Sequence, residues 1–202
     1  SVPHATKSGV AHFVYDDESQ CINAVKKLLS FLPQNNLENA KKIDGNSSDP
    51  NGEILRTIIP EKSTEPYNVI DVIDNIIDDK DFFEIQSNYA QNIVIGFGRI
   101  RGSSVGIVAN QPAHMAGMLD INASDKAARF VRFCDAYNIP IVTLVDVPGF
   151  MPGVNQEHQG IIRHGAKLIY AYAEATVPKI SVILRKAYGG AYIVMNSKEL
   201  RS

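Results

Sequence analysis

Two hydrophobic periods alternate along the second half of the chain. Apolar runs typical of β-strands cover 92–100, 104–109, 141–146 and 180–184, and helix-period patterns cover 125–137, 160–175 and the residues from 191 onward. The first two runs flank the turn Arg101-Gly102 and predict a hairpin, whereas each later run is followed by a turn and a helix. Strands that alternate with helices predict an α/β fold, with a sheet that is mostly parallel after the hairpin.

The first third of the chain is organised differently. Residues 1–33 hold a polar lead and one helix, which Pro33 ends. Residues 34–53 are rich in Asn, Asp, Ser and Gly and offer almost nothing to bury, which is typical of a linker. A second helix is expected after Pro66, with Asn68 as its N-cap and apolar positions that continue to Ile77. Ser124 is the expected N-cap of the helix over 125–137.

Composition excludes several classes of function. The chain has 202 residues, 45% of them hydrophobic, and a formal net charge of -2. This charge gives no electrostatic footprint for nucleic acid or an anionic membrane, and no apolar run approaches the about 20 residues that span a bilayer. Cys21 and Cys134 match no zinc pattern and are expected to be buried free thiols in a reducing compartment.

Three loops are expected to meet where the parallel strands end, because ligands gather at that edge of α/β sheets. They are 110–112, 147–159 and 187–191. In the last loop, Gly189 and Gly190 connect a strand to a helix, so free amides of the first helical turn can hold an oxyanion there. A plain Gly-Gly connection explains the same residues. In the middle loop, Phe150 and Met151 predict an apolar rim around a ligand, with a stiff connector as the alternative.

Two other patterns of reactive residues do not predict a catalytic or metal site. Ser104 fits G-x-S-x-G but enters a strand, whereas a nucleophile elbow joins a strand to a helix. His158 and His164 lie six residues apart, about 240° around a helix, and cannot share a metal from one face. No metal site is expected. Cationic residues near the loops are expected to be surface charges: Arg163, Lys167, Arg185 and Lys186.

Several long segments resemble one family. DVPGFMPGVNQEHQGIIRHGAKL at 146–168, AYAEATVPKI at 171–180, RKAYGGAY at 185–192 and GIVANQP at 106–112 carry the likeness. The chain resembles, over nearly its whole length, the carboxyltransferase (β) subunits of biotin-dependent acyl-CoA carboxylases, with propionyl-CoA carboxylases as the closest examples. The implied fold is a crotonase-like (ClpP/crotonase) spiral of ββα units.

The resemblance also implies a domain organisation. Members of the family have two crotonase-like halves in a chain more than twice as long and work as oligomers, with a hexamer expected here. Residues 1–33 would end the first half, 34–65 would be the linker, and 66–202 would begin the second half. The oxyanion hole for the thioester normally lies in the first half, so residues 1–202 alone are expected to be inactive.

The family's mechanism assigns roles to particular residues. Carboxybiotin releases CO2, and the ureido nitrogen takes the α-proton of the acyl-CoA before the enolate attacks CO2. By resemblance, the amides of Gly190 and Ala191 hold the ureido oxygen. The remaining implied site residues line the acyl-CoA and biotin channel or border the acyl pocket: Asn110, Gln111, Gly149, Phe150 and Ile193. Biotin would arrive on a carrier domain, with a biotin carboxylase as partner.

The expected function is therefore transfer of CO2 from carboxybiotin to a short acyl-CoA, with propionyl-CoA giving methylmalonyl-CoA. A methylmalonyl-CoA decarboxylase α subunit or a transcarboxylase would run this chemistry in reverse and shares the motifs. A membrane partner is expected only for a decarboxylase sodium pump. An inactive fragment or a biotin-independent crotonase-like enzyme is the remaining alternative. The expected location is the cytoplasm, or the mitochondrial matrix in a eukaryote.

Overall fold

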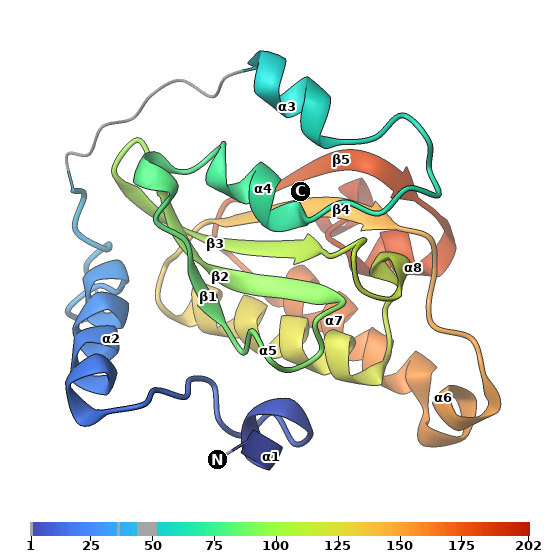
Figure 1. Cartoon of the computed structure of the whole chain (residues 1–202), viewed down its shortest axis with the longest axis horizontal. Helices are drawn as coiled ribbons and strands as arrows, with labels where there is room; N and C mark the ends of the chain where they lie inside the picture. The colour runs from blue at the N-terminus through green and yellow to red at the C-terminus, as the bar shows by residue number, and fades with distance from the viewer. Residues whose placement is uncertain (1, 36, 44–51) are drawn as a thin grey trace.

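A five-stranded mixed sheet forms the centre of the computed structural model, which describes residues 2–35, 37–43 and 52–202. Its strands, in spatial and chain order, are β1 (Phe83–Ile85), β2 (Ile93–Ile100), β3 (Ser103–Asn110), β4 (Ile141–Val147) and β5 (Lys179–Ala187) (Figure 1). β1, β2 and β3 pair antiparallel, and β3, β4 and β5 pair parallel. The predicted hairpin and the parallel strands after it are thereby confirmed.

Helices cover both faces of the sheet. The helices of the described residues are α1 (Val2–Thr6), α2 (Glu18–Phe31), α3 (Gly52–Ile58), α4 (Val69–Asp74), α5 (Ile121–Ala136), α6 (Val154–Gln159), α7 (Ile161–Glu174) and α8 (Gly189–Val194). α5 and α7 lie side by side against one face, and α4 lies against the other (Figure 1). In β2, Ile93, Ile95 and Phe97 belong to the core on the α5 side, whereas Val94 packs on the α4 side. This two-sided burial explains the nearly continuous apolar runs.

Two helices have ends that differ from the sequence prediction. Asp120, and not Ser124, caps α5, because its carboxylate accepts a hydrogen bond from the amide of Ala123 at 2.8 Å. The Ser124 hydroxyl instead donates to the Asp120 carbonyl at 2.8 Å, so the helix starts four residues earlier than the pattern indicated. Asn68 caps α4 as predicted and accepts from the amide of Ile70 at 3.1 Å, but α4 ends at Asp74, before Ile77.

Other elements were not predicted. β1 has only three residues, too few to show a period of two, and α3 and α6 lie in segments expected to be linker and loop. Of the expected linker, residues 36 and 44–51 lie outside the described residues. Gly160, with φ of +87°, separates α6 from α7 in a conformation that favours glycine. Cys134 is buried as expected, but Cys21 is exposed, which corrects the sequence expectation. In the described ranges, no helix is long and apolar enough to cross a membrane.

Candidate oxyanion and substrate site at the ends of the parallel strands

The three expected loops meet at one edge of the sheet. β3, β4 and β5 run parallel, so their carboxyl ends lie together. The amide of Asp146 at the end of β4 donates to the Asn110 side chain at 3.2 Å. The amide of Tyr188, after β5, donates to the carbonyl of Val147 at 3.1 Å. These bonds tie the three loops into one surface.

The turn after β5 supplies backbone donors. Gly189 has φ of +59°, so this position, and not Gly190, needs glycine for the turn itself. α8 starts here, and the amides of Gly190 and Ala191 belong to its first turn, where helix geometry provides no intrahelical acceptor. Gly190 is exposed, and a Cβ placed on it would meet only the Phe150 ring, at 3.8 Å. The backbone at Gly190 is therefore open to close approach by another molecule.

Phe150 is held firmly beside this turn. The carbonyl of Gly149 accepts from the amide of Leu119 at 3.1 Å, and the amide of Met151 donates to the Leu119 carbonyl at 2.7 Å. The Phe150 ring lies against Gly165 of α7, so close that a Cβ there would come within 2.7 Å of Cζ. The loop after β4 thus presents an apolar ring between α7 and the start of α8.

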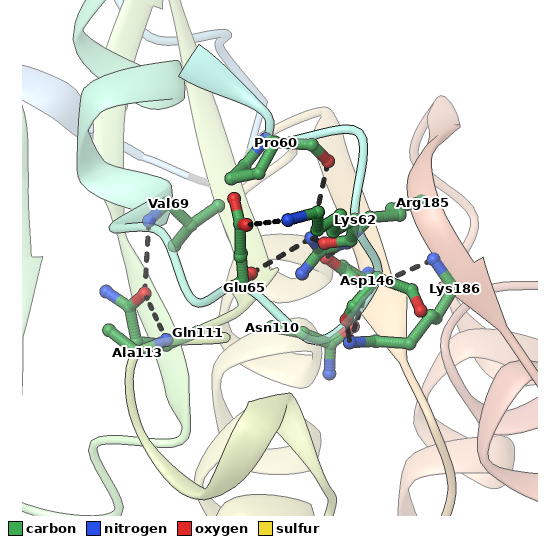
Figure 2. Close-up of polar contacts among 11 residues, drawn as sticks. Pro60, Lys62, Glu65, Val69, Asn110, Gln111, Ala113, Asp146, Arg185 and Lys186 are labelled. Atoms are coloured by element: carbon green, nitrogen blue, oxygen red, sulfur yellow. Dashed lines mark hydrogen bonds and ion pairs between the residues drawn. The ribbon is translucent and has the colours of Figure 1, made fainter.

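The Asn110 and Gln111 side chains are buried and bond within the protein. Gln111 Oε1 accepts from the amide of Val69 at 3.0 Å (Figure 2). Its Nε2 donates to Asn68 Oδ1 at 2.7 Å. Asn110 Nδ2 donates to the carbonyl of Gly117 at 3.3 Å. These bonds fix the path of the loop after β3, and a direct role in binding stays a prediction for both residues.

Ile193 lies on the outer side of α8. Its side chain is 45% exposed, whereas the neighbouring Val194 is 2% exposed and packs into the core. Ile193 therefore contributes little to the packing of α8 against the core. An exposed branched side chain two residues beyond Ala191 is available to contact a ligand.

Arg185 and Lys186 correct the expectation that they are surface charges. The Asp146 side chain is completely buried, and the Arg185 and Lys186 side chains are only 11% and 10% exposed. Arg185 Nε donates to Asp146 Oδ2 at 3.1 Å, and the amide of Lys186 donates to Oδ1 at 3.0 Å (Figure 2). The burial of these two cations cannot be predicted from local sequence, because β5 continues to Ala187 and the partner carboxylate lies 39 residues before Arg185.

The same two cations hold the segment before α4 against β5. Arg185 Nη1 donates to the carbonyls of Lys62 at 2.8 Å and Glu65 at 3.0 Å, and Lys186 Nζ donates to that of Ser63 at 3.0 Å (Figure 2 draws the Arg185 bonds). The Arg185 guanidinium also lies 5.0 Å from the centre of the Tyr67 ring. Burial, and then the charge of Asp146, raise the pKa of Tyr67 above its ordinary value. Its hydroxyl makes no hydrogen bond within the described part of the chain.

His164 forms hydrogen bonds within the protein. Its Nδ1 lies 2.8 Å from Asp125 Oδ2, and Lys167 Nζ donates to Asp125 Oδ1 at 2.9 Å. Among residues 2–35, 37–43 and 52–202, no group of three or more His, Cys, Asp or Glu side chains could hold a metal ion.

Backbone amides, an apolar rim and buried supporting charges thus lie together at the ends of the parallel strands of an α/β fold. The profile of the carboxyl transferase domain matches residues 2–202, and the chain belongs to this family.

Its relatives include several functional types. It is 56% identical to the carboxyltransferase subunit of propionyl-CoA carboxylase from Haloferax mediterranei, over 98% of this chain and 38% of that protein. It is also 56% identical to the methylmalonyl-CoA decarboxylase subunit alpha of Veillonella parvula, over 99% of this chain and 40% of that protein. The chain therefore spans about two fifths of the length of these relatives.

The fold matches solved carboxyltransferases. A crystal structure of the transcarboxylase 12S hexamer, with hydrolysed methylmalonyl-coenzyme A bound, superimposes with a TM-score of 0.96 at 57% identity. The match covers 98% of this chain and 40% of that one. The expected crotonase-like α/β fold is confirmed.

Proposed function

We propose that the chain is part of the carboxyltransferase component of a biotin-dependent acyl-CoA carboxylase. This component moves CO2 from carboxybiotin to the α-carbon of a short acyl-CoA, with propionyl-CoA as the preferred acceptor. The observation that carries the proposal is the glycine turn after β5, where the amides of Gly190 and Ala191 lie in the first turn of α8 and Gly190 is exposed beside Phe150. Membership of the carboxyl transferase family fits this chemistry.

The residues at the turn fit the ureido group of biotin, because Gly190 has no side chain to prevent a flat ring from approaching the backbone. Biotin, carried by a partner subunit, would supply the carboxyl group and accept the α-proton. The amides of Gly190 and Ala191 donate to the oxygen that gains negative charge, and losing one such donor costs about 10²–10³ in rate. Gly149 and Phe150 line the channel, and Ile193 borders the acyl group. Asn110 and Gln111 fix the loop beside it.

The domain organisation follows the same proposal. Residues 1–33 end the first crotonase-like half, 34–65 link the halves, and 66–202 begin the second. The assembly is a hexamer, as in the related 12S transcarboxylase. Its partners are a biotin carboxylase and a biotin carrier, and its location is the cytoplasm, or the mitochondrial matrix in a eukaryote.

A second function is the reverse reaction. The Veillonella relative, named as a methylmalonyl-CoA decarboxylase subunit, is as similar to this chain as the Haloferax carboxylase subunit, at 56% identity for both. A transcarboxylase of Propionibacterium freudenreichii is 58% identical. The partners distinguish these functions, because a biotin carboxylase implies carboxylation and a membrane sodium pump implies decarboxylation.

The test is affinity purification of the tagged protein from its native cells, followed by detection of biotinylated partners and two assays. We expect ATP-dependent fixation of labelled bicarbonate into propionyl-CoA. Decarboxylation of methylmalonyl-CoA without bicarbonate fixation would select the second function. Neither activity, in a preparation that contains a biotinylated partner, would contradict the proposal.

A further inference from the structure

The pairing of β4 with β5 is irregular just before the glycine turn. Val145 pairs with Ile183, whereas Val147 pairs with Ala187. One residue of β4, Asp146, therefore lies opposite the three residues of β5 from 184 to 186. Such a bulge bends the strand and leaves backbone groups without ladder partners, and bulges next to active sites redirect the residues that follow.

The Asp146 side chain fills this bulge. Its Oδ1 accepts from the amide of Lys186 at 3.0 Å, and so replaces the ladder partner that the bulge removes. Its Oδ2 accepts from Arg185 Nε at 3.1 Å, and the amide of Asp146 is held by Asn110 at 3.2 Å. The carboxylate has no exposed surface and is held by two groups of β5, and the backbone amide of the same residue is held from β3, so Asp146 has little freedom to move.

The pairing resumes directly after the bulge. Ala187 returns to register with Val147, and the amide of Tyr188 donates to the Val147 carbonyl at 3.1 Å. Gly190 follows two residues later. The direction in which the chain leaves β5 is therefore set by the bulge, and the direction of the Gly190 and Ala191 amides depends on it.

We propose that Asp146 is a positioning residue, whose carboxylate oxygen holds the Lys186 amide in the β5 bulge and so aims the Gly190 and Ala191 amides at the reacting oxygen. This inference rests on the proposed carboxyltransferase function. Asp146 acts through the backbone and touches no substrate. The Arg185 guanidinium at 3.1 Å and the Lys186 ammonium at 3.7 Å balance the buried charge, and the bond from the Lys186 backbone amide sets the geometry.

Two double variants in the assembled enzyme separate these contributions. Asp146→Asn with Arg185→Gln removes both charges but keeps an oxygen that accepts from the Lys186 amide. Asp146→Leu with Arg185→Met removes both charges and the acceptor. Replacing the buried partners Asp146 and Arg185 together by neutral or apolar residues of similar size is often tolerated, so we expect both proteins to fold. The Lys186 ammonium, 3.7 Å from Asp146 Oδ1 in the wild type, stays charged in both variants and therefore does not distinguish them. Asp135→Asn is the control, because Asp135 holds the amides of Thr176 and Val177 at the opposite end of β5.

We expect the Asn/Gln enzyme to keep kcat within about threefold of wild type. The kcat of the Leu/Met enzyme should be at least about tenfold below that of the Asn/Gln enzyme, because misdirected amides act like a lost oxyanion donor. The KM for acyl-CoA should stay unchanged in both, because the defect lies in the chemical step, and Asp135→Asn should leave kcat unchanged. Equal kcat in the two double variants, or a tenfold loss in the Asn/Gln enzyme, would overturn the positioning role. If the Leu/Met protein does not fold, the kcat of the Asn/Gln enzyme is used alone: a value within about threefold of wild type supports the positioning role, and a larger loss overturns it. A wild-type assembly without carboxyl transfer would instead refute the proposed function.

Discussion

The Phe150 ring lies between two glycines of different helices, with a Cβ on Gly165 coming within 2.7 Å of it and one on Gly190 within 3.8 Å. Gly165 therefore has no room for a side chain unless the ring moves, whereas Gly190 has ordinary contact distance. The absence of a side chain at Gly165 therefore sets the position of the Phe150 ring, which is proposed to line the acyl-CoA and biotin channel.

Gly165→Ala should displace the Phe150 ring toward the turn and lower kcat/KM for acyl-CoA by about tenfold, a change of about 1.4 kcal/mol in transition-state stabilisation. Steady-state kinetics and thermal unfolding check this together. Gly52→Ala, where a Cβ meets nothing within 4 Å, is the matched control. Unchanged kinetics in a folded Gly165→Ala enzyme would show that Phe150 does not contact the substrate.

Ile193→Asp should change acyl selectivity. The side chain is 45% exposed beside the proposed acyl pocket, and an apolar wall discriminates one methylene by about 1–3 kcal/mol. We expect the ratio of propionyl to acetyl kcat/KM to change several-fold, measured with both substrates in parallel. Equal losses for the two substrates would remove Ile193 from the acyl pocket, and Ile193→Val should leave the ratio close to that of wild type.

Lys126 should make stability depend on pH. Its buried ammonium lies within 2.7–3.3 Å of four carbonyl oxygens, those of Gln86, Tyr89, Ala90 and Ile93, and its three N–H groups donate to them. Burial lowers the pKa of Lys126 from 10.5 to about 8 in the folded protein. Between these values the unfolded chain binds more protons than the folded protein, so the contribution of this group to the free energy of unfolding rises with pH, by up to about 1.4 kcal/mol per pH unit.

Urea unfolding of wild type and Lys126→Met from pH 7 to 10.5 tests this prediction. The substitution should destabilise the protein at every pH, because four buried carbonyls lose a donor. The difference between the two proteins should grow above pH 8. Lys167→Met, at a side chain that is 50% exposed, should show no such growth. A difference that stays constant with pH would mean that Lys126 remains fully charged.

The sequence predicts the sheet and its long helices because their burial repeats locally. In β2, every second residue faces α5 and the others face α4, so the apolar run is visible without any tertiary information. The turn at Gly189-Gly190 can also be predicted from local sequence, because glycine adopts a φ of +59°, as at Gly189, without strain.

Features that depend on distant partners are hidden. Ser124 and Asp120 are both acceptable caps, and only the structure shows that Asp120 is used. The sequence predicts Arg185 and Lys186 to be surface charges because their partner Asp146 belongs to another strand. The internal bonds of Gln111 are hidden likewise, since its partner Val69 lies 42 residues away.

The central claim is that the amides of Gly190 and Ala191 hold the oxygen that becomes charged during transfer. Gly190→Val tests it most directly, because the structure accommodates a small side chain at this position while the branched side chain obstructs the approach of a flat ring. The measurement is kcat for carboxyl transfer to propionyl-CoA in the assembled enzyme, with circular dichroism to establish folding. The account predicts a loss of about 10²–10³ in kcat with the fold intact. A folded Gly190→Val enzyme with a near-normal kcat would contradict it.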